Sequence, residues 1–410
     1  MVLVGFAEAL SAPETVWSLV DDGFQVVAFA RKGRKSALRH SRHIVCHEIT
    51  APEADLQTSL AELQALMASL PGDIRTGQRI LFPLDDKGVW LGSKVRLDGW
   101  VHAGPQGSCA ELALNKCQQV QVAQDAGFNV PKTALARTAA EVFTFSQAES
   151  FPIILKPAEC VPVLQGRLHE CRKFVCANAV ELERAVAEWG GTIPLLVQSF
   201  VGGIGEGVFG LATADGVKAW SAHRRLRMMN PHGSGSSACI SQSVPQDLRA
   251  KVEAFVASTG WRGMFMIELL RDHDGNLWFV ELNGRPWGSM ALSRAQRLEY
   301  PAWHVQLVID QPAPPGMDLS SDAGVVCRHA GREFMHLLFV LRGPTSKALS
   351  SWPPFWRTLA EVARVRQGDV FYNWRRDDPK VFVADFYYTI MQAVSSCTCS
   401  SYLEARNRRR

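Results

Sequence analysis

Several features that would point to particular protein classes are missing from this 410-residue sequence. Its 44 Lys and Arg residues face 40 Asp and Glu residues, so the formal net charge is only +4. A general nucleic-acid binder of this size normally carries a much larger basic excess, and we expect no nucleic-acid partner. The ten cysteines form neither paired CxxC motifs nor the regular spacing of a secreted disulfide framework. We therefore expect reduced thiols.

Long apolar runs are also missing. The longest uncharged stretch near the C-terminus, residues 386–403, is rich in Ser, Thr, Cys and Gln and is too polar for a membrane-spanning helix. The N-terminal residues 1–14 have no cationic segment before their apolar stretch and meet Glu8 early, which is unlike a secretory signal. These patterns predict no membrane span and a cytoplasmic location.

The apolar content is nevertheless high enough for several cores. Hydrophobic residues make up 47% of the chain and charged residues 20%. A chain of this length exceeds one ordinary core, so two to four packed subdomains are expected. The first residues alternate an apolar run at 2–6, a helical stretch at 13–22 and a second apolar run at 24–30, which is a βαβ pattern. The first subdomain is predicted to end near residue 108.

Further elements can be placed by their patterns. A buried strand at 79–84 ends in Asp85 and Asp86, either at a ligand site on the carboxyl edge of a sheet or in a solvated turn. The other predicted elements are a helix over 110–127, strands at 151–157 and 195–201, a helix at 179–189, a glycine-rich bend at 202–207, and two strands within 208–226 joined at Asp215-Gly216. Residues 311–316 read as a linker, and 311–410 as largely helical.

The most informative segment is the predicted hairpin at 263–285. Asp274-Gly275 favours a two-residue turn, and the register that follows from it places Glu268 directly opposite Glu281. The same register pairs Ile267 with Leu282, and Leu269 with Val280, on a face that packs on a core. Two carboxylates facing each other at roughly 5 Å repel unless a proton or a cation lies between them.

Asn283 lies on the same face as Glu281 and adds a neutral oxygen. Three hard oxygen ligands suit Mg²⁺ bound together with phosphate oxygens and water, with Mn²⁺ as an alternative. Arg285 follows two residues later, where its planar cation can hold a phosphoryl group or a substrate carboxylate. The hairpin therefore predicts a magnesium site that binds a nucleotide.

With these residues, the sequence resembles the ATP-grasp superfamily, and more narrowly its carboxylate-amine ligases related to the large chain of carbamoyl-phosphate synthase. The resemblance covers residues 1–310 and is carried by Lys116, Lys156-Pro, Gln198-Ser-Phe-Val201, His223-Arg-Arg-Leu-Arg227, Glu268 and Glu281-Leu-Asn-Gly-Arg-Pro-Trp-Gly-Ser289. It implies an ATP-grasp fold of the α/β and α+β classes: a Rossmann-like pre-ATP-grasp domain (1–108), a first lobe (109–194), a second lobe with the metal site (195–310), and a mainly helical extension (311–410).

The resemblance also implies roles. Lys116 and Lys156 would hold the α- and β-phosphates of ATP. The hinge residues Gln198, Ser199, Phe200 and Val201 would read adenine through main-chain groups, and Glu206 would meet the ribose unless it is a solvated loop acid. Glu268, Glu281 and Asn283 would bind Mg²⁺, and Arg225 and Arg285 would steady the transferred phosphate. His223 is either a ligand contact or a structural histidine.

Two departures from the family pattern stand out. Pro157 is followed by no glycine- and serine-rich flap, so the flap over the phosphates is expected to be shorter or reorganised, and the hinge reads Gln-Ser where relatives often have Gln-Glu. The Gly/Ser-rich loop 233–237 is a candidate cover for the intermediate or a plain connector.

The implied reaction is ATP-dependent: a carboxylate is phosphorylated and an amine then displaces phosphate, giving an amide. The expected partners are thus a small carboxylate and a small amine, with a homodimer as an open possibility. The alternatives are a bicarbonate-phosphorylating enzyme and an ATP-binding regulator without turnover.

Overall fold

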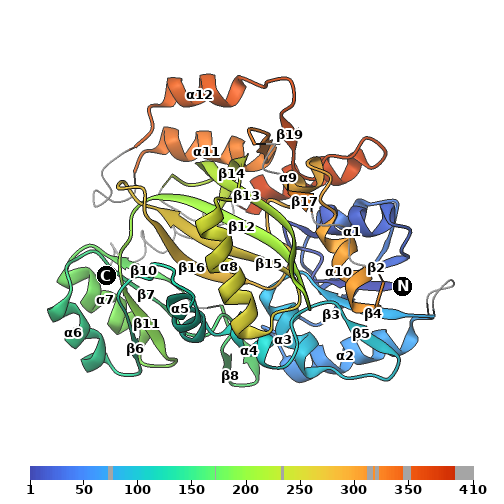
Figure 1. Ribbon diagram of the computed structural model, residues 1–410, viewed down its shortest axis with the longest axis horizontal. Helices are drawn as coiled ribbons and strands as arrows, with labels where there is room; N and C mark the ends of the chain where they lie inside the picture. The colour runs from blue at the N-terminus through green and yellow to red at the C-terminus, as the bar shows by residue number, and fades with distance from the viewer. Residues whose placement is uncertain are drawn as a thin grey trace, which may run out of the picture.

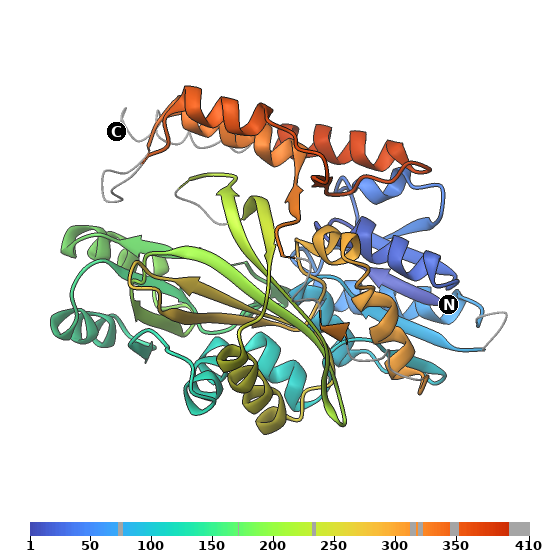
Figure 2. The ribbon, with the colours of Figure 1, turned by 45° about the horizontal axis from the view of Figure 1, so that its top comes forward.

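The computed structural model describes residues 1–72, 77–170, 172–231, 235–311, 317–318, 323–344 and 352–392. A parallel sheet at the N-terminus, a small antiparallel sheet and a large central sheet follow one another along the chain (Figure 1). Helices of the C-terminal segment run over the central sheet toward the N-terminal sheet (Figure 2). The predicted linker 311–316 lies outside the described residues except for Gln311.

The N-terminal sheet has the parallel order β3-β2-β1-β4-β5. Its strands are β1 (Val2–Gly5), β2 (Val26–Arg31), β3 (Val45–Ile49), β4 (Arg79–Pro83) and β5 (Trp100–His102). Val2 and Val4 pack beneath α1 (Ala12–Asp21), whereas Leu3 faces the opposite core with α2 (Leu56–Ser69) and α3 (Asp86–Lys94). Burial on both faces explains the uninterrupted apolar runs of these strands, and the βαβ prediction is confirmed.

Helices from later in the chain complete the N-terminal layer. The short helix α9 (Met290–Ala295) and α10 (Tyr300–Val308) follow the predicted hairpin in sequence but contact α1. Tyr300 and Val305 are fully buried in the same core as Val2 and Trp17. The segment after the hairpin at 263–285 therefore belongs to the N-terminal core in space. The domain boundaries themselves stay predictions.

The small sheet has the order β10-β7-β11-β6. It contains β6 (Thr133–Ala136), β7 (Ile153–Pro157), β10 (Phe174–Cys176) and β11 (Leu195–Ser199), with α6 (Ala139–Ala148) and α7 (Ala179–Trp189) packed on it. The predicted strands at 151–157 and 195–201 and the helix at 179–189 are confirmed.

The predicted single helix over 110–127 is wrong in one respect. It is divided into α4 (Ser108–Leu114) and α5 (Lys116–Asp125), which meet at Asn115. Asn115 is extended, forms a β-bridge with Glu159, and caps α5 by accepting hydrogen bonds from the N–H groups of Cys117 and Gln118. A capping asparagine therefore starts a new helix, and Lys116 is its first residue.

The central sheet has the order β16-β15-β12-β13-β14-β18-β19, with β17 beside β13. Its strands are β12 (Ile204–Thr213), β13 (Gly216–Met228), β14 (Ser236–Gln242), β15 (Gly263–Arg271), β16 (Leu277–Asn283), β17 (Met317–Asp318), β18 (Val326–Arg328) and β19 (Val370–Phe371). α8 (Gln246–Thr259) and α5 cover one face. The predicted pair of strands within 208–226 is confirmed, but the predicted bend at 202–207 is wrong from residue 204 onward, because β12 starts there.

The C-terminal segment contacts both the central sheet and the N-terminal domain. Its strands β18 and β19 extend the central sheet beside α11 (Ala330–Arg342) and α12 (Phe355–Ala363), and a further helical stretch spans residues 379–392. At the start of that stretch, the buried Asp378 accepts hydrogen bonds from Trp17 Nε1 at 3.1 Å, Ser41 Oγ at 2.5 Å and the Arg42 N–H at 3.3 Å. This carboxylate ties the C-terminal segment to the N-terminal domain.

We predict that Asp378→Ala lowers the free energy of unfolding by about 3 kcal/mol, because it leaves the buried donors of Trp17 and Ser41 without an acceptor. Urea denaturation followed by tryptophan fluorescence measures the change. The matched control is Asp377→Ala, one residue earlier, where the side chain is far more exposed. An equal loss in the two variants would contradict this account.

Candidate functional site

The hairpin of β15 and β16 brings two glutamates face to face. Glu268 is the register partner of Glu281, and Ile267 is the partner of Leu282, which confirms both predicted pairs. Ile267 and Leu282 are buried in the core beneath the sheet. Because neighbouring residues of a strand alternate between faces, Glu268, Glu281 and Asn283 share the opposite face.

The turn of this hairpin differs from the prediction. Residues 272–276 form a five-residue loop, in which the Asp272 carboxylate accepts hydrogen bonds from the Asn276 N–H and Nδ2 and from Trp278 Nε1. The longer loop shifts the register by one residue, and a bulge after Glu268 shifts it back. Leu269 consequently pairs with Phe279 and not with the predicted Val280.

Each glutamate is held by a cation from another element. Lys116 Nζ lies 2.5 Å from Glu281 Oε2, and Arg225 Nη2 lies 2.6 Å from Glu268 Oε1. Burial by itself raises the pKa of Glu281, but the charges of Lys116, Lys173 and Lys156 outweigh burial and hold that pKa well below its usual value. Glu281 is therefore a carboxylate at neutral pH, and its negative charge is balanced by lysines.

Lys156 completes this cluster from the small sheet. It lies on β7, is buried, and has no carboxylate within ion-pair distance among the described residues. Burial, followed by the positive charge of Lys116, lowers the pKa of Lys156 to about 8, against the opposing effect of Glu281 and Glu268. The structure thus brings together both predicted phosphate-binding lysines and both predicted metal-binding glutamates.

One register row crosses the central sheet at this point. Glu281, Glu268, Gly207, His223 and Ser241 are successive partners on β16, β15, β12, β13 and β14. Because Gly207 has no side chain, no side chain of this row lies between Glu268 and His223. Burial, with the positive charge of Arg225, lowers the pKa of His223 to about 3, and neither ring nitrogen has a hydrogen-bond partner among the described residues. His223 is a buried neutral imidazole at neutral pH.

Gly205 leaves room for Arg225 in the same way. A Cβ atom added at Gly205 would lie 2.6 Å from Arg225 Cδ and 2.8 Å from Nη1. The Arg225 side chain therefore crosses β12 over Gly205 to reach Glu268. The glycines that the sequence placed in a bend instead allow close approach of side chains across a strand.

A cavity of about 330 Å³ adjoins the cluster. Its lining includes Lys116, Glu281, Lys173, Arg285 and Asp86. Arg285 Nε donates to Asp86 Oδ1 at 2.8 Å, which joins the metal-site hairpin to the start of α3. Burial by itself lowers the pKa of Arg285. The negative charges of Asp86 and Glu281 raise that pKa by more than burial lowers it, so the guanidinium keeps its charge. Asp85 and Asp86 thus line a cavity at the carboxyl end of β4, which agrees with the first of the two predicted alternatives and not with the solvated turn.

The segment after Lys156 contributes Pro157, Glu159, Cys160 and Val161 to the lining of this cavity. It contains a small hairpin of β8 (Val163–Leu164) and β9 (Arg167–Leu168). The hairpin is docked on the N-terminal domain: Leu56 N–H donates to the Gly166 carbonyl, Leu168 N–H donates to the Pro52 carbonyl, and the Leu168 side chain is buried. The predicted shorter or reorganised flap falls on this short, anchored hairpin, and its role over the phosphates stays a prediction.

The hinge residues are more engaged than predicted. Gln198 is buried and donates to Thr133 Oγ1, and Ser199 Oγ donates to Glu149. The Ser199 and Phe200 N–H groups donate to the carbonyls of Lys132 and Pro152. The N–H groups of Ser199 and Phe200 are therefore already engaged within the protein, and the adenine-binding role of the hinge stays a prediction.

Glu206 lies apart from the other predicted site residues. Its register partner is Leu269, next to Glu268, so it points to the face opposite the two metal-site glutamates. Both of its oxygens are bound by Arg271, at 2.7 Å to Nε and 2.9 Å to Nη2. The structure therefore supplies a structural ion pair at this position and does not bring Glu206 to the cluster.

Lys173 was not among the predicted residues. It lines the cavity and contributes to the low pKa of Glu281. The only sequence signal was its place directly before the short apolar run at 174–176, which is too short to predict a strand edge at a phosphate site. The predicted covering loop 233–237 cannot be followed, because residues 232–234 lie outside the described part of the chain.

No protein-family model and no curated protein matches the sequence. Solved structures do match. The chain is similar to biotin carboxylase from Campylobacter jejuni (15% identity, TM-score 0.58, 79% of this chain and 73% of that one) and to N5-carboxyaminoimidazole synthetase from Staphylococcus aureus (14%, 0.55, 77% and 78%). It is also similar to an L-amino acid ligase from Bacillus licheniformis (15%, 0.55, 79% and 78%). All three are ATP-grasp enzymes.

The chain has the ATP-grasp fold. The predicted fold class is thereby confirmed, including the Rossmann-like N-terminal sheet. In the ATP-grasp fold of this chain, the small sheet supplies Lys156 and the central sheet supplies the two facing glutamates. No helix among the described residues is long and apolar enough to cross a membrane.

We predict that Gly205→Ala displaces Arg225 from Glu268 while leaving the fold intact, because only the distal atoms of a flexible side chain have to move. Nucleotide turnover should fall about tenfold, with the free energy of unfolding unchanged to within about 1 kcal/mol. The control is Gly92→Ala in α3, where an added Cβ meets only ordinary contacts at 3.7 Å or more. Full turnover in Gly205→Ala would show that this ion pair is dispensable.

Proposed function

We propose that this protein is an ATP-dependent ligase that joins a small carboxylate to an amine through an acyl phosphate and releases ADP and phosphate. One observation carries the proposal: two acidic side chains, Glu268 and Glu281, face each other within a cluster of cations drawn from three separate elements. Such a cluster suits a polyanion bound together with a divalent metal.

Binding of the triphosphate falls to Lys116, Lys156, Lys173 and Arg285. Phosphoryl transfer from ATP to a carboxylate brings two anions together, and its barrier is mainly electrostatic. The lysines that now balance Glu281 would turn to phosphate oxygens, and Arg285 would steady the transferred group from the Asp86 side. Lys116, Lys173 and Arg285 already line one cavity, so little reorganisation of the backbone is needed.

The residues present also fit Mg²⁺. Glu268 and Glu281 are carboxylates on one face, and Asn283 on the same face is buried, with no side-chain hydrogen bond to any described residue. Two carboxylates and an amide oxygen would hold the ion and leave positions for phosphate oxygens and water. When bound, Mg²⁺ would supply positive charge that neutralises the transferred phosphoryl group.

The reaction requires no nucleophile from the protein. A carboxylate oxygen of the substrate attacks the γ-phosphorus, the bond to the β-phosphate oxygen breaks, and ADP leaves. The amine nitrogen then attacks the acyl carbon, the bond to phosphate breaks, and the nitrogen loses a proton. Cys160 lines the cavity, but burial raises its pKa to about 12, so the thiol is protonated and a poor nucleophile.

Bicarbonate phosphorylation and ATP binding without turnover are the two alternatives. Relatives in fold include carboxylases as well as an amino acid ligase, so the fold is compatible with either acid. A homodimer also stays a proposal; the biotin carboxylase domain from Hydrogenobacter thermophilus, which is 16% identical, is described as a dimer.

The test is ADP and phosphate release from ATP and Mg²⁺ with panels of carboxylates and amines, bicarbonate and ammonia included. We expect release that depends on one class of organic acid, and amide formation when an amine is added. Release with bicarbonate alone would favour carboxylation, and nucleotide binding without any release would favour the regulator.

Glu281→Gln and Glu268→Gln should each lower ADP release about 100-fold or more, because each removes a proposed metal ligand and half of an ion pair. The matched control is Glu253→Gln on the exposed side of α8, which should retain wild-type turnover. Persistence of turnover in Glu281→Gln would overturn the metal assignment.

A further inference from the structure

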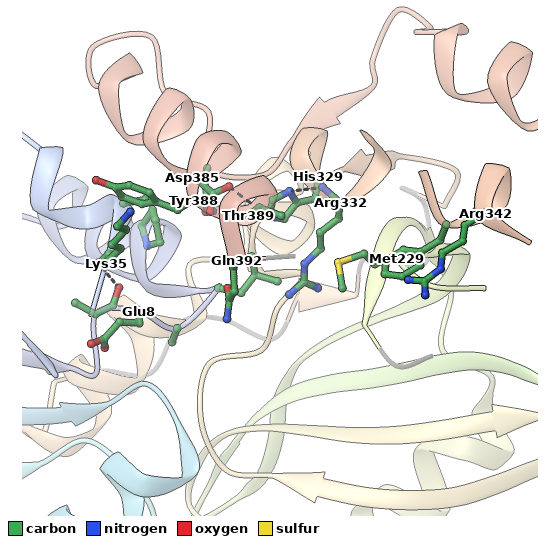
Figure 3. A pocket seen from close by; sticks show the side chains of 18 residues that line it. Glu8, Lys35, Met229, His329, Arg332, Arg342, Asp385, Tyr388, Thr389 and Gln392 are labelled. Carbon is green, nitrogen blue, oxygen red and sulfur yellow. Dashed lines mark hydrogen bonds and ion pairs between the residues drawn. The ribbon is translucent and has the colours of Figure 1, made fainter. Parts of the chain in front are cut away.

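A second and larger cavity lies between the N-terminal domain and the C-terminal segment. Its volume is about 610 Å³. One wall is formed by the turns that follow β1 and β2, and the other by α11 and the helical stretch at 379–392 (Figure 3). The carboxyl ends of β1 and β2 thus open into it, and ligands of open parallel sheets bind outside the carboxyl ends of the strands. A volume of 300–1,000 Å³ is typical of small-molecule sites.

The charges in this cavity are unbalanced. Of its two carboxylates, Glu8 accepts hydrogen bonds from Arg31, and Asp385 lies 3.3 Å from His329 Nε2 and acts electrostatically on Arg332. Arg332 projects into the cavity from α11 (Figure 3), and among the described residues its guanidinium donates only to the Ser236 carbonyl, at 3.2 Å. Lys35 lines the opposite side. Among the described residues, Arg332 therefore lines the cavity with no carboxylate within ion-pair distance, and Asp385 is the nearby negative charge that acts on it.

The remainder of the wall combines polar and apolar side chains. The polar side chains include Ser36, Arg342, Asn373, Tyr388, Thr389 and Gln392. Leu10 and Pro13 of the N-terminal domain, Met229 directly after β13 and Phe339 of α11 supply apolar surface. An occupant with one anionic group and an apolar body would pair its charge with Arg332 and bury the body against these side chains. Arginine binds carboxylates through two parallel N–H donors, which favours a carboxylate as the anionic group.

A third cavity adjoins both this one and the proposed transfer site. This intermediate cavity, about 820 Å³, shares Glu8, Lys35 and Gln392 with the first, and shares Asp85, Lys87 and Glu170 with the cavity beside Glu281. Arg332 also lies near Arg225: burial lowers the pKa of Arg332, whereas Tyr372 and Asp385 raise it and the positive charge of Arg225 lowers it again. The first cavity thus lies on the side of the N-terminal sheet that also carries the proposed transfer site.

We infer that this cavity is the binding site for the acid substrate, that the substrate is an apolar carboxylic acid, and that Arg332 of the C-terminal segment binds its carboxylate. The inference rests on the proposed ligase function. The C-terminal segment would then take a direct part in selecting the substrate. The acid-binding cavity would be separate from the nucleotide site.

The experiment measures equilibrium binding of matched acids and amides by calorimetry, without nucleotide. The probes are 4-phenylbutyrate and octanoate, each compared with its own amide. We expect the acids to bind the wild-type protein and the amides to bind at least about tenfold more weakly, because only the acid pairs with Arg332. Arg332→Gln should weaken acid binding by about tenfold or more.

Two further variants serve as a second test and as a control. Ala9→Phe fills the cavity without removing a charge, so it should weaken acid binding even if Arg332→Gln does not fold. Arg357→Gln removes an equal charge from the exposed side of α12 and should bind the acids like the wild type. Absence of acid binding to the wild type, equal binding of acids and amides, or unchanged acid binding in both Arg332→Gln and Ala9→Phe would overturn the inference.

ADP release separates this inference from the ligase proposal. Acid binding that depends on Arg332, without acid-dependent ADP release from ATP and Mg²⁺, would refute the ligase and keep the acid site. Acid-dependent ADP release whose KM for the acid is unchanged in Arg332→Gln and Ala9→Phe would keep the ligase and refute the acid site.

Discussion

The repulsion between Glu268 and Glu281 is the constraint on which the rest of the site depends. The hairpin register places two carboxylates on adjacent positions of one face, and an apolar core beneath the other face holds them there. Like charges so close are tolerated only beside positive charge. Lys116 and Arg225 supply it, and the positions of both are explained by this need.

The partners of the two glutamates come from elements that no local pattern connects. Lys116 starts a helix whose Asn115 cap is itself tied to the strand-end segment after Lys156. Arg225 reaches across a strand because Gly205 has no side chain. Arg285 is joined to the N-terminal domain through Asp86. One local conflict of charge is thus resolved by contacts among all three sheets, which makes the site a product of their packing.

Prediction from the sequence succeeded where a periodic pattern determines a face. The pairing of Glu268 with Glu281 is correct although the turn is not, because the apolar alternation on both strands selects the register and a bulge absorbs the longer loop. The βαβ opening follows in the same way from the buried apolar runs of the first residues, whereas the ATP-grasp fold class was implied by the resemblance of the motifs from Lys116 to Ser289. The stretch around Glu206 was predicted as a bend because it is rich in glycine, whereas in the structure its glycines lie in a strand.

The sequence by itself determined the register that pairs Glu268 with Glu281 and the strands of the N-terminal sheet, since these depend on alternation and local side-chain chemistry. Only the tertiary structure decided that Lys173 lines the cavity beside Glu281, that Glu206 pairs with Arg271 on the opposite face of the sheet, and that helices after residue 290 return to the first domain. It also decided that Arg332 faces the ends of β1 and β2. These outcomes depend on contacts between residues far apart in the chain, and no spacing along the sequence encodes such distances.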